Sequence, residues 1–221
     1  MLPFDDAARL ARMTEWAKTI ATEVADDLLQ HHIFLQVQDV IRANPQLTNA
    51  RSHFFEWMGD VFVASASVAV RRQTDNADDS VCLRRLLREI RDYPQVVTRA
   101  HYLVVCGAPD DEAAFDNSSF DQWAGEGGAH LDPHLVDADL QSLLDVSERI
   151  RHYANKRVAH YDRRGVTPGM MPTFDDLEEA YKLIESLTQK YHLIFTGVWI
   201  GQLRPTIIYP WTDVFRVPWI Q

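Results

Sequence analysis

The stretch LARMTEWAKTIATEVADDLL, residues 10–29, carries apolar side chains at steps of three and four residues. This spacing places them on one face of an α-helix, which turns once in about 3.6 residues. The pattern runs from Phe4 to about Gln38 and includes Leu10, Met13, Trp16, Ile20, Val24 and Leu28. It predicts one long amphipathic helix whose apolar stripe must be covered by other helices.

The same period recurs along most of the chain. Residues 49–74 are apolar around most of the helix circumference, which predicts a helix in the middle of a bundle. Ser80 and Thr98 can each cap a further helix, and residues 134–161 again follow a helical period. The helix after Ser80 has a stripe of leucine and isoleucine that should be buried, made of Leu83, Leu86, Leu87 and Ile90.

A last long helix is expected after Thr173, which together with Asp176 resembles a capping box. Its predicted buried stripe consists of Phe174, Leu177, Tyr181, Ile184, Leu187 and Tyr191. Because helices follow one another without a strand pattern, the sequence predicts an all-α, up-and-down helical bundle.

Two segments lack the helical period. Residues 107–133 are rich in Asp and Glu and predict a long acidic loop. Residues 202–221 hold three prolines and two tryptophans, which predicts an extended C-terminal tail laid over apolar surface of the bundle. We expect one helical domain over residues 1–221, with residues 1–48 as an N-terminal helical extension.

Composition limits the class of protein and its partners. Hydrophobic residues make up 46% of the 221 residues and charged residues 24%, as in soluble globular proteins. The net charge of −10 means that a polyanion can bind only at a local basic patch. Cys82 and Cys106 have no metal-type spacing, and no apolar run is long enough to span a membrane. These features predict a reduced cytoplasmic protein without a membrane partner.

A local basic patch occurs in RHYANKRVAHYDRR, residues 151–164. On a helical wheel Ala154 falls on the core side, in a stripe with Leu140, Leu143, Ser147, Ile150 and Val158. His160 falls on another side together with Arg149, His152, Tyr153, Lys156, Arg157 and Arg164. A histidine there can transfer a proton near neutral pH, while the cations attract phosphate. The alternative is a solvated charged face.

The segment NKRVAHYD, residues 155–162, resembles the motif of HEPN domains, an Arg followed after four to six residues by a His. The wider chain resembles the abortive-infection branch of that superfamily. The similar segments are FFEWMGDVFVASASVAVRRQTDNADDSVCLRRLLREI, PTFDDLEEAYKLIESLTQKY and WTDVFRVPWI. The resemblance covers the chain from about Phe54 to the C-terminus.

The resemblance implies a helical bundle that dimerises, so that two motif helices form a cleft. In catalytic members this cleft is a metal-independent ribonuclease site, which needs no cofactor. The motif histidine corresponds to His160 and the polar position after the motif arginine to Asn155. The arginine position itself holds Ala154.

The candidates for the missing guanidinium group are therefore arginines elsewhere in the chain. Arg71 and Arg72 end the preceding apolar helix, where Asp75 can orient them, and Arg157 lies one turn before His160. The remaining candidate residues are the phosphate-binding Arg149, Lys156, Arg157 and Arg164 and the orienting Asp162.

Three functions follow from this pattern. The first is a defence or toxin-type protein that binds RNA at the cationic cleft and cleaves it, with His160 as general acid or base. The second is a non-catalytic module that binds an antitoxin or a protein of a defence complex. The third is a nucleotide-binding or nucleotide-modifying protein. In each case we expect a homodimer, and the acidic segment 107–133 can cover the cationic face as a lid.

Tryptophans and other histidines give weaker signals. Trp57 is expected in the core, Trp211 and Trp219 are expected to anchor the tail, and Trp123 to fix the acidic loop or contact a partner. His31 and His32 are adjacent and point apart on a helix, so they make a poor metal pair.

Overall fold

The computed structural model describes residues 4–50, 52–107, 113–159, 165–167, 169–204 and 206–217. The described residues form helices and no β-strand, which confirms the predicted all-α class. The elements are α1 (Phe4–Ala43), α2 (Pro45–Thr48), α3 (His53–Gln73), α4 (Leu83–Asp92), η1 (Pro94–Val96), α5 (Arg99–Cys106), α6 (Ala113–Ala124), α7 (Pro133–Val146), α8 (Glu148–Tyr153), η2 (Ala154–Val158), α9 (Phe174–Thr196) and η3 (Trp211–Arg216).

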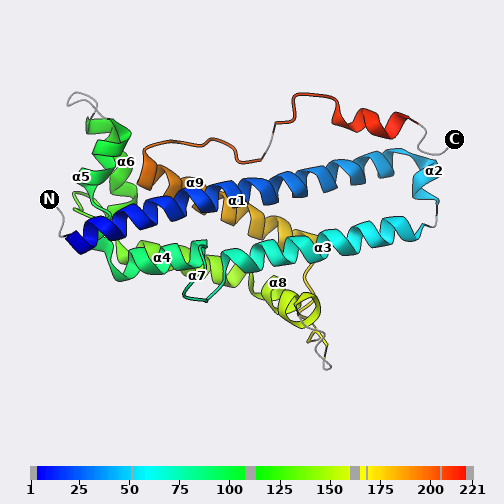
Figure 1. The fold of residues 1–221 in the computed structure, drawn as a ribbon, viewed down its shortest axis with the longest axis horizontal. Coiled ribbons are helices and arrows are strands. Elements are labelled where there is room, and N and C mark those ends of the chain that lie inside the picture. Colours follow the sequence, from blue (N-terminus) through cyan, green and yellow to red (C-terminus); the bar gives the residue numbers. More distant parts are fainter. Residues whose placement is uncertain are drawn as a thin grey trace.

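Helix α1 is the spine of the bundle and packs along α9 (Figure 1). Its predicted stripe is buried at Met13, Trp16, Ile20, Val24 and Leu28, as the periodicity indicated. The segment predicted as an N-terminal extension therefore supplies a large part of the hydrophobic core. Within the described residues, none of the helices combines the length and the apolar character that crossing a membrane requires.

Helix α9 begins at the predicted capping box and ends at a glycine. The Thr173 hydroxyl accepts from the Asp176 N–H at 3.1 Å, and an Asp176 carboxylate oxygen accepts from the Thr173 N–H at 2.6 Å. At the other end Gly197 has a φ of 69°, and a Cβ atom there would lie 2.0 Å from the Val105 carbonyl oxygen. Glycine is required because a side chain would be strained in this conformation and would strike the end of α5.

Helix α4 packs on α7 and presents the predicted leucine stripe to the core. The predicted cap is wrong, because the N-cap position is Cys82, which makes no side-chain capping bond. The Ser80 hydroxyl instead donates to the Ala77 carbonyl at 2.8 Å. The serine lies two residues too early to reach the free N–H groups of the helix and closes the preceding turn.

Helix α3 lies in the bundle only over its second half, so its predicted central position is wrong for the first half. In the described chain, no side chain is buried between Phe34 of α1 and Ala66 of α3. Trp57, expected in the core, is 58% exposed and lies near the exposed Phe54 and Val61. A helix that is apolar on all sides is buried only where another element covers it. The hairpin formed by α1 and α3 extends beyond the start of α9, so α9 covers only part of it (Figure 1).

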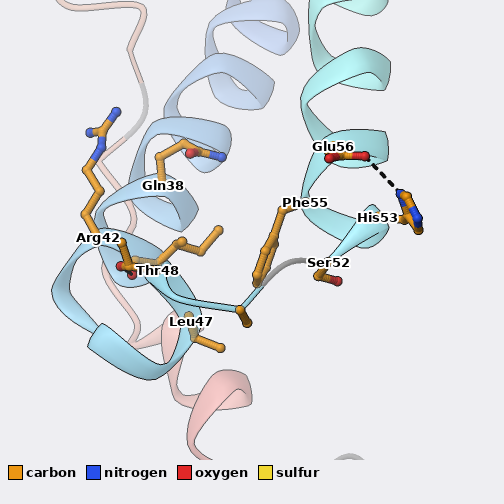
Figure 2. Close-up of a pocket in the computed structure, with 10 residues that line it drawn as sticks. Gln38, Arg42, Leu47, Thr48, Ser52, His53, Phe55 and Glu56 are labelled. Carbon is orange, nitrogen blue, oxygen red and sulfur yellow. Dashed lines mark hydrogen bonds and ion pairs between the residues drawn. The ribbon is translucent and has the colours of Figure 1, made fainter.

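The end of this hairpin holds an open hollow of about 740 Å³. It is lined by the last turn of α1, by α2 and by the first turn of α3 (Figure 2). Phe55 points toward α2, whereas His53 and Glu56 pair at 2.9 Å on the outer side of α3. The hollow lies about 24 Å along α3 from Arg71, at 1.5 Å per residue.

The predicted acidic loop is wrong for Ala113–Ala124, which form α6, while residues 108–112 lie outside the described part. Phe120 is fully buried, and its neighbour Trp123 meets Tyr102 edge to face at 5.5 Å. Asp121 pairs with Arg99 of α5. The acidic residues of segment 107–133 made the whole segment resemble a loop. The aromatic side chains of Phe120 and Trp123 nevertheless dock this helix on Tyr102 of α5.

The C-terminal tail follows the long edge of α1 (Figure 1). The Trp211 indole donates to Gln36 Oε1 at 2.7 Å, which confirms its anchoring role, and Arg204 pairs with Glu178 at 3.0 Å and Glu185 at 3.2 Å. The tail is not packed on the bundle along its whole length, since the side chain of its Ile208 is 92% exposed. Trp219 lies outside the described residues.

A buried histidine makes stability depend on pH. His31 is 4% exposed, and its ring stacks on Tyr181 at 4.8 Å and on Phe62 at 5.9 Å between centroids. Burial lowers the pKa of His31 below its ordinary value of 6.5, although Glu178, 3.5 Å away, opposes this shift. The unfolded chain thus binds the proton more readily than the folded chain.

We therefore expect stability to be retained above pH 6.5 and to fall as the pH drops through the range below 6.5. His31→Phe keeps the aromatic stack and should make this loss smaller. Part of the loss of stability should remain in this variant, because burial also lowers the pKa of His101. Urea unfolding at pH 7.5 and 5.5 measures the effect. An equal loss in the wild type and in His31→Phe would contradict this role of His31.

Candidate functional site

The motif helix changes its winding just before the motif histidine. α7 ends at Val146, where the Ser147 hydroxyl bonds back to the Leu143 carbonyl at 2.6 Å. α8 follows and then passes into the π-helix η2, in which the Ala159 N–H donates to the Ala154 carbonyl at 2.8 Å. π-helical turns are rare and occur frequently at functional sites.

The predicted core side of this helix is confirmed up to Ala154, whereas Val158, predicted in the same stripe, is only half-buried and lines an open hollow. Leu140, Leu143, Ser147, Ile150 and Ala154 are buried, and Ala154 is 0% exposed. The position that carries arginine in the HEPN motif thus faces the interior of this protein, next to α3. Asn155, the following residue, is exposed.

The structure brings Arg71 of α3 to Asn155 of η2. The Arg71 Nε–H donates to the Asn155 side-chain oxygen at 2.6 Å. The two residues are 84 positions apart in the chain, and the packing of α3 against α8 and η2 joins them. An arginine from another helix therefore stands beside the motif segment that lacks its own, and the amide fixes the orientation of its guanidinium group.

Arg72 is engaged differently. Its guanidinium pairs with Asp27 of α1 at 2.9 Å, and the Asp27 side chain is only 8% exposed. Burial raises the pKa of Asp27 and outweighs the opposing effect of Arg72. Sequence reasoning missed Asp27, although its place beside Leu28 on the apolar face of α1 was a signal. A carboxylate there needs a cation, and Arg72 supplies it.

An open hollow of about 360 Å³ lies beside this ion pair, between α1, α3 and η2. Small side chains and polar groups line it, namely Asp27, Gln30, Ala64, Ser65, Val68, Arg72 and Val158. Val158 is two positions before His160 in the chain. His160 itself lies outside the described residues, as do Asp162 and Arg164.

The structure does not gather all the predicted residues. Arg149 pairs with Asp176 at the start of α9, at a distance of 3.2 Å. Hydrogen bonds from Thr173 and from Arg149 lower the pKa of the Asp176 carboxyl group. Asp75 accepts from the Asn76 N–H at 2.8 Å and so holds the turn after α3 rather than Arg71 or Arg72.

Lys156 and Arg157 lie on η2 itself. His152 accepts at Nε2 from the Thr167 N–H at 3.3 Å. Among the described residues, no group of three or more His, Cys, Asp and Glu side chains is arranged to hold a metal ion.

Three arginines of α4 hold the loop that ends α3. Arg84 donates to the Thr74 carbonyl at 3.2 Å and Arg85 to the Ser80 carbonyl at 2.9 Å. Arg88 donates to the Asn76 side chain at 3.0 Å. These bonds fix the chain directly after Arg71 and Arg72 and so help to position both side chains.

Comparison with known proteins identifies the family. A family model described as AbiU2 (HEPN_AbiU2) matches residues 14–201, a range that contains Asp27, Arg71, Arg72 and Asn155. No curated protein and no solved structure matches the chain. Because the matched range covers most of the sequence, the chain belongs to the HEPN_AbiU2 family and is an abortive-infection-type HEPN domain.

Proposed function

We propose that this HEPN protein binds RNA at the face formed by the end of α3 and η2 and cleaves it without a metal ion. The observation that carries the proposal is the Arg71–Asn155 bond of 2.6 Å at the π-helix that precedes His160. It supplies, from α3, a guanidinium group beside the motif segment where Ala154 replaces the motif arginine. Arginine recognises phosphate oxygens through paired N–H donors.

The proposed chemistry uses the 2′-hydroxyl of the RNA as nucleophile. A bond forms between O2′ and phosphorus, while the bond from phosphorus to O5′ breaks. His160 either takes the proton from O2′ or gives one to the leaving O5′, and water makes the other transfer. Arg71 stabilises the charge on the non-bridging oxygens. The products are a 2′,3′-cyclic phosphate and a 5′-hydroxyl. General acid–base catalysis suffices because the nucleophile is held next to phosphorus within the substrate.

Arg71 is the first residue to test. Replacing it with alanine should weaken binding of a non-cleavable RNA by about 10- to 100-fold, since a hydrogen bond to a charged group contributes about 1.5–3 kcal/mol. Fluorescence anisotropy with a 2′-O-methyl oligonucleotide at low salt measures this loss. Arg42→Ala, which removes a cation at the far end of α1 paired with Asp39, should leave binding within twofold. Equal affinities of both variants would contradict the proposed site.

A non-catalytic interaction module is the second candidate, and two observations favour it. Ala154 stands at the position of the motif arginine, and the exposed Phe54, Trp57 and Val61 leave apolar surface on α3 that the described residues do not cover. In this case the surface binds a second copy of the chain, an antitoxin or a protein of a defence complex. Mass measurement by light scattering of the wild type and of Trp57→Ala distinguishes a homodimer from a monomer.

A further inference from the structure

Within the part of the chain that the structure describes, several arginines near the proposed site have no carboxylate partner. Acidic residues outnumber basic ones, 32 to 22, and most described arginines elsewhere form ion pairs. Around the end of α3 Arg72 pairs with Asp27, whereas Arg71, Arg84, Arg88 and Arg151 bond, within the described chain, only to amides or carbonyl groups. Such a cluster in an acidic chain is incomplete without an anion.

Arg84 and Arg151 show this most clearly. Arg84 donates to the Thr74 carbonyl at 3.2 Å, and Arg151 donates to the Leu144 carbonyl at 3.1 Å. The Nε–H groups of both are buried and have no acceptor among the described residues. A buried donor without an acceptor destabilises the fold, and more so when the group is charged.

The two charges also act on each other. Burial lowers the pKa of Arg151, and the nearby charge of Arg84 lowers it further. Glu148 and Asp145 oppose this effect more weakly, and neither forms an ion pair with Arg151. Arg151 bonds to the end of α7, on which α4 with Arg84 packs, so two partly buried guanidinium groups lie in one region with their charge only partly offset.

This pair adjoins the proposed cleavage site on both elements. Arg151 precedes Asn155 by four residues, about 6 Å along the helix axis. Thr74, which binds Arg84, follows Arg71 by three residues and donates its own N–H to the Arg71 carbonyl. The backbone positions of Thr74 and Arg151 thus lie about one helical turn from Arg71 and Asn155, respectively.

We propose that Arg84 and Arg151 form a second phosphate subsite, which holds the RNA phosphate next to the scissile one. This inference rests on the proposed function, and it adds which phosphate of the RNA strand each group of arginines holds. A phosphate seated between the two guanidinium groups accepts from both and neutralises their mutual repulsion. With one phosphate held there, the neighbouring phosphate is fixed at Arg71.

The test is the salt dependence of RNA binding. For a single strand, the logarithm of affinity falls against the logarithm of salt concentration with a slope of about 0.7 per neutralised phosphate. The double variant Arg84→Gln and Arg151→Gln, measured with a 2′-O-methyl RNA oligonucleotide, should lose about 0.7 from the wild-type slope. Arg91→Gln is the control, since Arg91 lies on the same α4 helix but pairs with Asp137 and Asp92. Glutamine retains a donor for the carbonyl groups, and circular dichroism verifies folding.

A second arm separates this subsite from the proposed function. Inorganic phosphate should raise the melting temperature of the wild type and of Arg91→Gln, but not of the double variant. If RNA fails to bind the wild type while this phosphate effect depends on Arg84 and Arg151, the subsite holds free phosphate and its RNA role falls with the proposed function. If RNA binds and the double variant keeps the full slope, the subsite is overturned and the proposed function stands.

Discussion

His160→Ala should lower RNA cleavage by about 10²–10⁴-fold, which is the contribution of a well-placed general acid or base. The position follows η2 directly in the chain, after the residues that bring Arg71 and Asn155 together. RNA affinity should change little, because proton transfer contributes to the transition state rather than to binding. Single-turnover cleavage of a labelled RNA measures the loss.

The control for this prediction is His134→Ala. His134 is an exposed histidine on the first turn of α7, so its replacement removes an imidazole without touching the proposed site. It should cleave at the wild-type rate. Equal activity of His160→Ala and His134→Ala would show that His160 takes no part in the reaction.

Placing the arginine of the HEPN motif at position 154 should destabilise this protein. Ala154 is 0% exposed, and its neighbours on the same face, Ile150 and Ser147, are buried too. In Ala154→Arg the side chain either overpacks the contact with α3 or leaves a charge buried without a partner. A buried charge without a partner costs about 3–5 kcal/mol, which is a large share of the stability of a typical domain. Urea unfolding at pH 7.5 measures the change.

Ala159→Arg is the matched control, because Ala159 lies at the end of η2 and is exposed. Its effect on the free energy of unfolding should stay within about 0.5 kcal/mol. If Ala154→Arg is as stable as the wild type and cleaves RNA faster, position 154 is open to the site. Arg71 then does not replace the motif arginine.

Local patterns in the sequence predicted most of the helices. The stripes of α1 and α4 and the capping box at Thr173 depend on neighbouring residues along one helix, and such short-range physics can be read from the chain. Trp57 was misplaced because burial depends on which elements reach a helix. The apolar circumference of α3 does not contain that information.

The candidate site was predictable only in part. The motif segment identified Asn155, and the position of Arg71 at the end of an apolar helix suggested it as the missing cation. Its contact with Asn155 joins two helices 84 residues apart and follows from packing. Asp27 was missed because its partner Arg72 lies 45 residues away, so no local pattern connects them. The same holds for Arg84 and Arg151, whose significance lies in the fact that neither forms an ion pair within the described chain.

The most direct test of the proposed ribonuclease is the chemistry of its product ends. Wild-type protein in excess chelator would be mixed with a labelled RNA and with the same strand carrying 2′-deoxynucleotides throughout. We expect cleavage of the RNA alone, with 2′,3′-cyclic phosphate and 5′-hydroxyl ends identified by mass spectrometry. Cleavage of the deoxy strand, ends of another kind, or intact RNA after incubation with the folded protein would contradict a 2′-hydroxyl mechanism at this site.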